Sequence, residues 1–237
     1  MKHVFVTTSW DDGHKLDVRL GSLLKKYQIK GTFYISPEDH EYKKADLLSE
    51  KEIKNLAKDF EIGAHTLTHP HLSKIPLKKA DYEIRESKKY LENLTGRKIT
   101  SFCYPYGDYN QDVVNLVRKN GFTFARTIKR FTFSKQNKPL ETGTSFHTYI
   151  HYSEIPAIFW LTKKTVLPFP RYTNWENSAM DLFDYACKRN SLFHLWGHQI
   201  EFEKYGQWEK LERVLRYISR RKGVEYITNG EINAIKP

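Results

Sequence analysis

The 237-residue sequence lacks an apolar run long enough to cross a membrane. The longest candidate, residues 155–161, falls short of the roughly 18 to 20 residues that a membrane span requires, and two lysines follow it at 163–164. The N-terminus also lacks the charged-then-apolar pattern of a signal peptide, because residues 1–3 (MKH) lead directly into a strand-like segment. These absences predict a cytoplasmic protein without a transmembrane segment.

Cysteine is scarce, and the basic residues are not gathered into one tract. Cys103 and Cys187 are the only two cysteines, which excludes a disulfide framework and agrees with a reducing compartment. The formal net charge is +11, but the basic residues are scattered as pairs such as Lys25-Lys26. We therefore expect solvated helix faces and no nucleic-acid partner. Attraction to an anionic substrate or an acidic membrane surface is the alternative.

Strand-like and helix-like segments alternate along the whole chain, without a linker, a repeat or a low-complexity tract. This alternation predicts a single domain over residues 1–237, built on a parallel sheet or barrel with helices outside. Residues 160–175, rich in proline and aromatic side chains, are expected to form a long irregular loop. The expected strands are 4–10, 31–35, 60–64, 99–104, 122–128, 145–150, 192–196 and 225–228.

Polar residues follow several of these strands. Asp11 and Asp12 end the first strand, His65 ends the third, Tyr106 follows the fourth, and His194 lies on a strand near the end of the chain. In a parallel α/β barrel the carboxyl ends of the strands open on one face, which carries the active site. These side chains are therefore expected to converge.

The histidine pair and the two aspartates suggest a metal site. His65 and His69 are four residues apart, so one helical turn or a loop brings both imidazoles to one side, and Pro70 disfavours a longer helix. Two histidines and one carboxylate form a hydrolytic site that leaves a coordination position open. The second aspartate can then accept a proton from water. The alternative is a plain Asp-Asp-Gly turn beside unrelated histidines.

Four sequence blocks, in order, resemble those of the polysaccharide deacetylases, also called NodB-homology or carbohydrate esterase family 4 enzymes. The blocks are SWDDG at 9–13, HTLTH at 65–69, YPYG at 104–107 and LFH at 192–194. Each block is weak alone, but the ordered set spans most of the chain.

The resemblance implies a distorted (β/α) barrel with about seven parallel strands and a divalent metal that is zinc, cobalt, nickel, iron or manganese, with zinc preferred. It also implies a position for each site residue. These are Asp11 as general base, Asp12, His65 and His69 as metal ligands, His194 as general acid, the Tyr106 backbone N–H as oxyanion donor, and Leu192 as the wall for the acetyl methyl group.

The third block departs from the family pattern. The family commonly has arginine two residues before the proline, where this chain has Cys103. That arginine usually orients the base. Arg126, near the end of the next expected strand, is the candidate replacement, and we predict its guanidinium close to the Asp11 carboxylate. A solvent-facing Arg126 is the alternative.

The segment after the last block adds further candidates. His198 is an alternative acid, or a residue that orients His194. Trp196 is either a sugar-stacking wall or a core tryptophan. The aromatic residues of the expected loop form either a carbohydrate platform or packing beneath it; these are Phe169, Tyr172 and Trp175.

The function implied by the resemblance is hydrolysis of an N-acetyl group on a sugar or glycan precursor. A cytoplasmic address favours a nucleotide-linked, lipid-linked or small saccharide over a mature polymer. One alternative is a deacylase of a non-sugar amide or an O-acetyl ester. The other is an inactive carbohydrate-binding relative, whose mark would be loss of the base or the acid histidine.

Overall fold

The computed structural model describes residues 4–134, 138–149, 151–162 and 169–235. Within these ranges the chain forms one curled sheet in which every strand pair is parallel, in the order β5-β4-β3-β2-β1-β7-β6, with β8 paired to β1. The strands are β1 Val4–Trp10, β2 Thr32–Ile35, β3 Glu61–Ala64, β4 Ser101–Cys103, β5 Phe124–Arg126, β6 Phe146–His147, β7 Leu192–Gly197 and β8 Val224–Tyr226. Seven strands on the main path confirm the predicted distorted (β/α) barrel.

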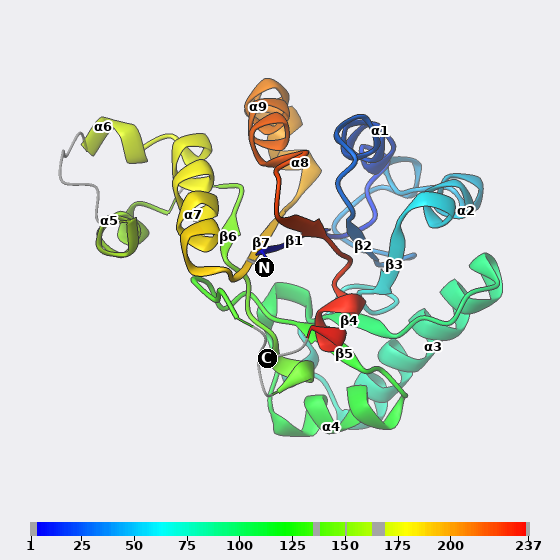
Figure 1. Ribbon diagram of the computed structural model, residues 1–237. Coiled ribbons are helices and arrows are strands. Elements are labelled where there is room, and N and C mark those ends of the chain that lie inside the picture. Colours follow the sequence, from blue (N-terminus) through cyan, green and yellow to red (C-terminus); the bar gives the residue numbers. More distant parts are fainter. Residues whose placement is uncertain (1–3, 135–137, 150, 163–168, 236–237) are drawn as a thin grey trace.

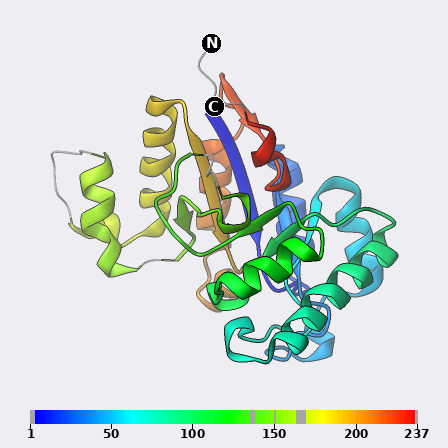
Figure 2. The same ribbon diagram turned by 90° about the horizontal axis from the view of Figure 1, so that it is seen from below.

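Helices cover the outer side of this sheet (Figure 1). In Figure 2, β1 and β7 run side by side through the centre of the molecule, as their six-residue register requires. The helices are α1 Asp17–Tyr27, α2 Glu50–Asp59, α3 Leu77–Thr95, α4 Gln111–Lys119, α5 Ile155–Thr162, α6 Phe169–Tyr172, α7 Trp175–Arg189, α8 Gln199–Lys204 and α9 Trp208–Ile218. None of the described helices is long and apolar enough to cross a bilayer.

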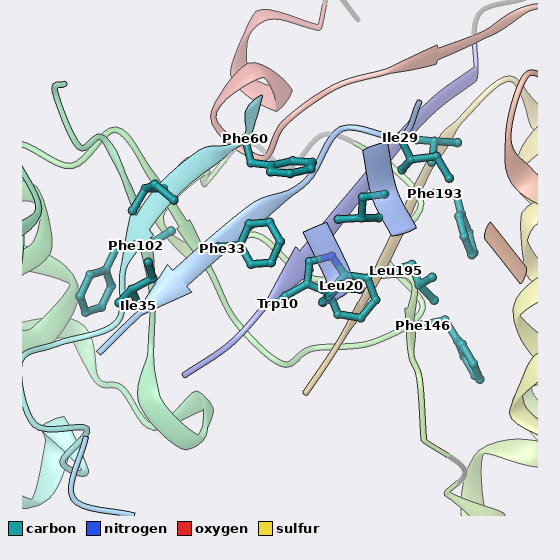
Figure 3. Close-up of a cluster of buried hydrophobic side chains, with 14 of the residues drawn as sticks. Trp10, Leu20, Ile29, Phe33, Ile35, Phe60, Phe102, Phe146, Phe193 and Leu195 are labelled. Carbon is teal, nitrogen blue, oxygen red and sulfur yellow. The ribbon is translucent and has the colours of Figure 1, made fainter. Parts of the chain in front are cut away.

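The hydrophobic core lies between the sheet and its helices. Successive residues of a strand face opposite sides, so one set of side chains packs under the helices (Figure 3); it includes Trp10, Phe33, Ile35, Phe193 and Leu195. The alternate set faces the inside of the barrel and contains many polar groups. The side chains that face the inside of the barrel are therefore not part of the core under the helices, and those at the carboxyl ends of the strands can form an active site.

The prediction of an irregular loop at residues 160–175 is wrong for the part of this range that the structure describes. Ile155–Thr162 and Phe169–Tyr172 are helical, and α7 begins at Trp175, where the Asn174 side chain caps the helix by accepting the Glu176 N–H. The apolar α5 packs on α7, which stabilises a helix that its composition alone does not predict. Residues 163–168 and the Phe169 side chain lie outside the described part of the chain.

Candidate active site

Asp12, His65 and His69 come together at the carboxyl end of the sheet. The Asp12 Oδ1 atom is 3.6 Å from the Nε2 atom of His65 and 3.6 Å from that of His69, and the two Nε2 atoms are 3.2 Å apart. A tetrahedral ion with bonds of about 2.0–2.1 Å needs ligand atoms about 3.3–3.4 Å apart. The three donor atoms therefore have the spacing of a metal site.

The backbone that carries these ligands follows an unusual path. Asp12, Thr66 and His69 have φ values of 78°, 67° and 59°, a region that non-glycine residues seldom occupy and that often marks functional sites. The Thr66 hydroxyl accepts the His69 N–H at 3.0 Å. The Glu83 carboxylate, from α3, accepts the two backbone N–H groups of residues 67–68. The histidine pair thus sits on a braced loop, one of the two predicted forms.

The second nitrogen of His65 fixes the tautomer of that ring. His65 Nδ1 is 2.8 Å from the Cys103 carbonyl oxygen, so it carries the proton and the Nε2 lone pair faces Asp12. His69 Nδ1 faces carboxylate oxygens of Asp39 at 3.9 Å and Glu41 at 3.6 Å. Burial and the neighbouring His69 lower the pKa of His65 to about 4, which keeps this ring neutral.

Asp12 directs one carboxylate oxygen at the Nε2 atoms of both histidines. Its Oδ2 atom accepts the Tyr42 hydroxyl at 3.0 Å, whereas its Oδ1 atom is buried without a hydrogen-bond partner among the described residues. Two imidazole nitrogens and a carboxylate oxygen that all face one point are the donor set of a hydrolytic divalent-metal site. The side chains present therefore fit the predicted ion.

Asp11 lies beside this cluster and is paired with Arg126. The guanidinium binds the Asp11 carboxylate and also contacts Cys103 Sγ at 2.8 Å. Cys103 and Arg126 are register partners on β4 and β5, so the arginine reaches Asp11 from the adjacent strand. Arg126 is fully buried, which is the predicted position and excludes the solvent-facing alternative.

This pairing decides the charge of Asp11. Burial would raise the pKa of Asp11, but Arg126, with smaller effects of His65 and His198, outweighs burial and lowers it. Burial also acts against the charge of Arg126, yet Asp11 raises the pKa of the guanidinium overall. Asp11, the candidate base, is therefore an ionised carboxylate held in a buried ion pair with Arg126.

His198, and not His194, lies at the cavity beside Asp11. His198 Nε2 is 3.9 Å from Asp11 Oδ2, and its Nδ1 is 3.8 Å from Glu201 Oε1. His194 pairs with Thr7 deeper in the barrel, is fully buried and contacts the Ser9 hydroxyl at 2.8 Å. Burial, with Arg126, lowers the pKa of His194 to about 3. His194 therefore does not reach the cavity, contrary to its predicted position, whereas His198, the predicted alternative, does.

The position that the LFH block predicted for Leu192, beside the acetyl group, is also wrong. It begins β7 and packs against Phe124, Ile227 and Ile232 in a separate apolar cluster, so it does not reach the cavity. Interior positions on β7 recur every second residue, and Trp196 is the residue that reaches the cavity wall. The acetyl-pocket prediction thus moves from Leu192 to Trp196.

The burial of Trp196, Tyr172 and Trp175 disagrees with the predicted alternative in which aromatic rings stack on a sugar. Trp196 is only 4% exposed, and its ring packs on His147 at 4.1 Å and under the Arg126 guanidinium at 4.4 Å. A ring this buried offers no face to a sugar. Tyr172 and Trp175 are buried as well, so they do not form a carbohydrate platform.

Tyr106 lies on the cavity rim, as the third block implies. Its φ of 57° belongs to a tight turn after β4, its hydroxyl contacts Glu41, and its ring stacks on His71 at 3.9 Å. The exposed fraction of Tyr106 is 43%, so its side chain is open to solvent at the rim.

The cavity holds about 340 Å³ and includes residues that the sequence did not single out. Glu41 and Tyr42 come from the loop after β2, and Ile200 and Glu201 come from α8. Their only signal was position, because loops after barrel strands line the active face. Ile128, after β5, completes this unpredicted set.

Fold and site together define an α/β barrel whose reactive side chains gather where its parallel strands end. The family model for polysaccharide deacetylase matches residues 2–125, more than half of the sequence. The chain therefore belongs to the polysaccharide deacetylase family, as the four blocks indicated.

Individual relatives agree with this family. The chain is 26% identical to the putative polysaccharide deacetylase YxkH of Bacillus subtilis over 61% of this chain and 56% of that protein. It is 28% identical to the poly-β-1,6-N-acetyl-D-glucosamine N-deacetylase of Staphylococcus aureus, over 45% of this chain and 41% of the relative. The chain thus spans about half the length of these curated relatives.

Solved structures support the fold. A putative polysaccharide deacetylase from Mycobacterium smegmatis superposes with a TM-score of 0.70 at 14% identity, covering 98% of this chain and 91% of that one. The likeness extends over nearly the whole of both chains, so the barrel and its connections are shared.

Proposed function

We propose that this protein is a metal-dependent deacetylase that hydrolyses an N-acetyl group on a sugar. The observation that carries the proposal is the convergence of Asp12, His65 and His69 beside Asp11 and His198 at one cavity, in a chain of this family. The first three residues would hold the ion, which would polarise the acetyl carbonyl and lower the pKa of water. Zinc is the ion proposed first.

Asp11 is the proposed general base. Its Oδ1 atom is buried without a hydrogen-bond partner among the described residues, whereas Oδ2 is bound by Arg126. One oxygen is therefore fixed and the other is left to accept a proton. Arg126 positions the carboxylate and keeps it ionised, the state that a base requires.

His198 is the proposed general acid. Burial would lower the pKa of His198, but Asp12, Glu201 and Asp11 raise it to about 9. The imidazolium is then the form present at neutral pH, and it can give a proton to the leaving amine. Glu201 faces Nδ1 and leaves Nε2 directed to Asp11, so base and acid share one side of the cavity.

The carbonyl oxygen of the substrate needs a donor as it becomes negative. The Tyr106 backbone N–H is proposed for this role because the turn at 105–107 lies on the cavity rim. Trp196 is proposed to border the acetyl methyl group, because it is the apolar residue of β7 at the cavity.

The proposed substrate is an N-acetylated saccharide, by analogy with the relative named for poly-β-1,6-N-acetyl-D-glucosamine. Nucleotide-linked and lipid-linked sugars belong to the same proposal because the sequence favoured a cytoplasmic address. The test is acetate release from a panel of N-acetylated oligosaccharides and sugar nucleotides, with an O-acetyl ester and a simple amide as controls.

The expected result is acetate release from at least one N-acetylated sugar, lost on chelation and restored by zinc or cobalt. The Asp11→Asn variant is the matched control, since it should keep the ion and lose turnover. Release that persists in excess chelator, or release from the ester alone, would contradict the proposal.

A further inference from the structure

A second group of potential ligands lies beside the cavity, apart from the three proposed above, and two of its members, His198 and Glu201, line the cavity. His147 from β6, His198 after β7 and Glu201 from α8 place their ligand atoms within 4.8 Å of one another. His147 Nε2 is 3.5 Å from Glu201 Oε2, and His198 Nδ1 is 3.8 Å from Glu201 Oε1. The proposed reaction gives His147 no role.

The tautomer of His147 follows from its neighbours. His147 Nδ1 faces His151 Nε2 at 3.4 Å, and Arg130 Nη2 is 2.7 Å from the same His151 nitrogen. A guanidinium only donates, so His151 Nε2 is an acceptor, and the His147 nitrogen that faces it carries the proton. A neutral His147 therefore has its lone pair on Nε2.

That lone pair points to another acceptor. His147 Nε2 and Glu201 Oε2 are both buried and have no hydrogen-bond partner among the described residues. Two buried acceptors that face each other are unfavourable unless a cation lies between them.

The ring of His147 is also held in place. It is 5% exposed and stacks on Trp196 at 4.1 Å with an angle of 24°. Its Nδ1–H is directed to His151, the outer contact that commonly orients a metal-bound imidazole. The lone pair therefore cannot easily turn away from Glu201.

We infer that His147, His198 and Glu201 form a second divalent-cation site, beside the one formed by Asp12 and its two histidines. Two imidazoles and a carboxylate suit zinc, cobalt or nickel. Binding at this site does not depend on the proposed function.

One consequence does rest on the proposed function. An imidazolium needs a proton on both nitrogens. An ion on His198 Nδ1 removes one of them, so His198 can no longer act as the acid. Excess metal then inhibits the enzyme by occupying the second site.

The test counts zinc bound per chain by equilibrium dialysis. Wild type should bind two equivalents and His147→Phe one, because phenylalanine keeps a ring for Trp196 but offers no ligand. His40→Ala, which removes an exposed histidine, should still bind two. His65→Ala should lose the other equivalent and keep this one, so failure of the proposed catalytic site is seen separately.

The inference is overturned if His147→Phe binds as many equivalents as wild type. If that variant unfolds, as judged by circular dichroism, His147→Asn is counted in its place with the same expectation. In the activity assay, inhibition of His147→Phe should need at least about tenfold more zinc than wild type. Unchanged inhibition would refute the link to His198.

Discussion

Replacing Arg126 with methionine tests how the barrel supports its base. Arg126 and Asp11 are both buried and paired, so the variant leaves a buried carboxylate without its cation. Breaking a buried ion pair by removing one partner costs about 3–5 kcal/mol. We expect Arg126→Met to lose about that much free energy of unfolding at neutral pH, and most of its activity.

The pH dependence of this loss has a definite sign. In the wild type Arg126 depresses the pKa of Asp11 below its ordinary value of 3.8, so the pair stabilises the fold above that value and the effect is lost as pH falls through the depressed pKa. In Arg126→Met only the smaller effects of His65 and His198 oppose burial, so the pKa of Asp11 is raised relative to the wild type. The difference between the two proteins should therefore grow as pH rises from 4 through the raised pKa.

Urea denaturation of the metal-free proteins between pH 4 and 8 measures this difference. Asp11→Asn/Arg126→Met is the control, because it removes the charge that the single variant leaves unpaired. It should recover much of the lost stability. A loss below about 1 kcal/mol for Arg126→Met, or an equal loss with asparagine at 11, would refute the reasoning.

Further variants test the other residues of the site. Cys103→Arg in the Arg126→Cys background returns the guanidinium from β5 to its register partner on β4, and should recover part of the acetate release that Arg126→Cys loses. His198→Ala should lower turnover by about 10²–10⁴-fold, whereas His194→Asn should change turnover by less than tenfold; equal losses would restore His194 as the acid. Both carboxylate oxygens of Asp17 are buried and have no hydrogen bond to any residue that the structure describes, and burial, Asp12 and Asp11 raise its pKa well above 3.8. Its ionisation therefore destabilises the fold as pH rises, so Asp17→Asn should raise the melting temperature at pH 8 and have little effect near pH 4; a lower melting temperature at pH 8 would contradict this.

The convergence of Asp12, His65 and His69 was predictable because all three lie on the loops that follow β1 and β3. A parallel barrel brings the carboxyl ends of its strands together whatever the detailed strand order. Arg126 was predictable for a related reason, since the residue that replaces a lost guanidinium must lie at the same level of an adjacent strand.

The choice between His194 and His198 shows where sequence reasoning stopped. His194 and His198 are four residues apart, and interior positions on a strand recur every second residue, so both fit an inward-facing register. Only the end of β7 at Gly197 decides which one reaches the cavity. The matching LFH letters favoured the deeper histidine, and Leu192 was misplaced with it.

Other parts of the cavity depend on tertiary packing. Glu41 and Tyr42 lie on a long loop whose path is fixed by contacts with Asp12 and Tyr106, which local patterns do not contain. The helix at α5 was missed because its stability comes from packing on α7 rather than from its own composition.

The most direct measurement of the central claim is the anomalous difference map of a crystal grown with cobalt. The account predicts a peak about 2.0–2.2 Å from Asp12 Oδ1, His65 Nε2 and His69 Nε2. A fully loaded crystal with no peak between these three atoms, or with cobalt only at other residues, would contradict it.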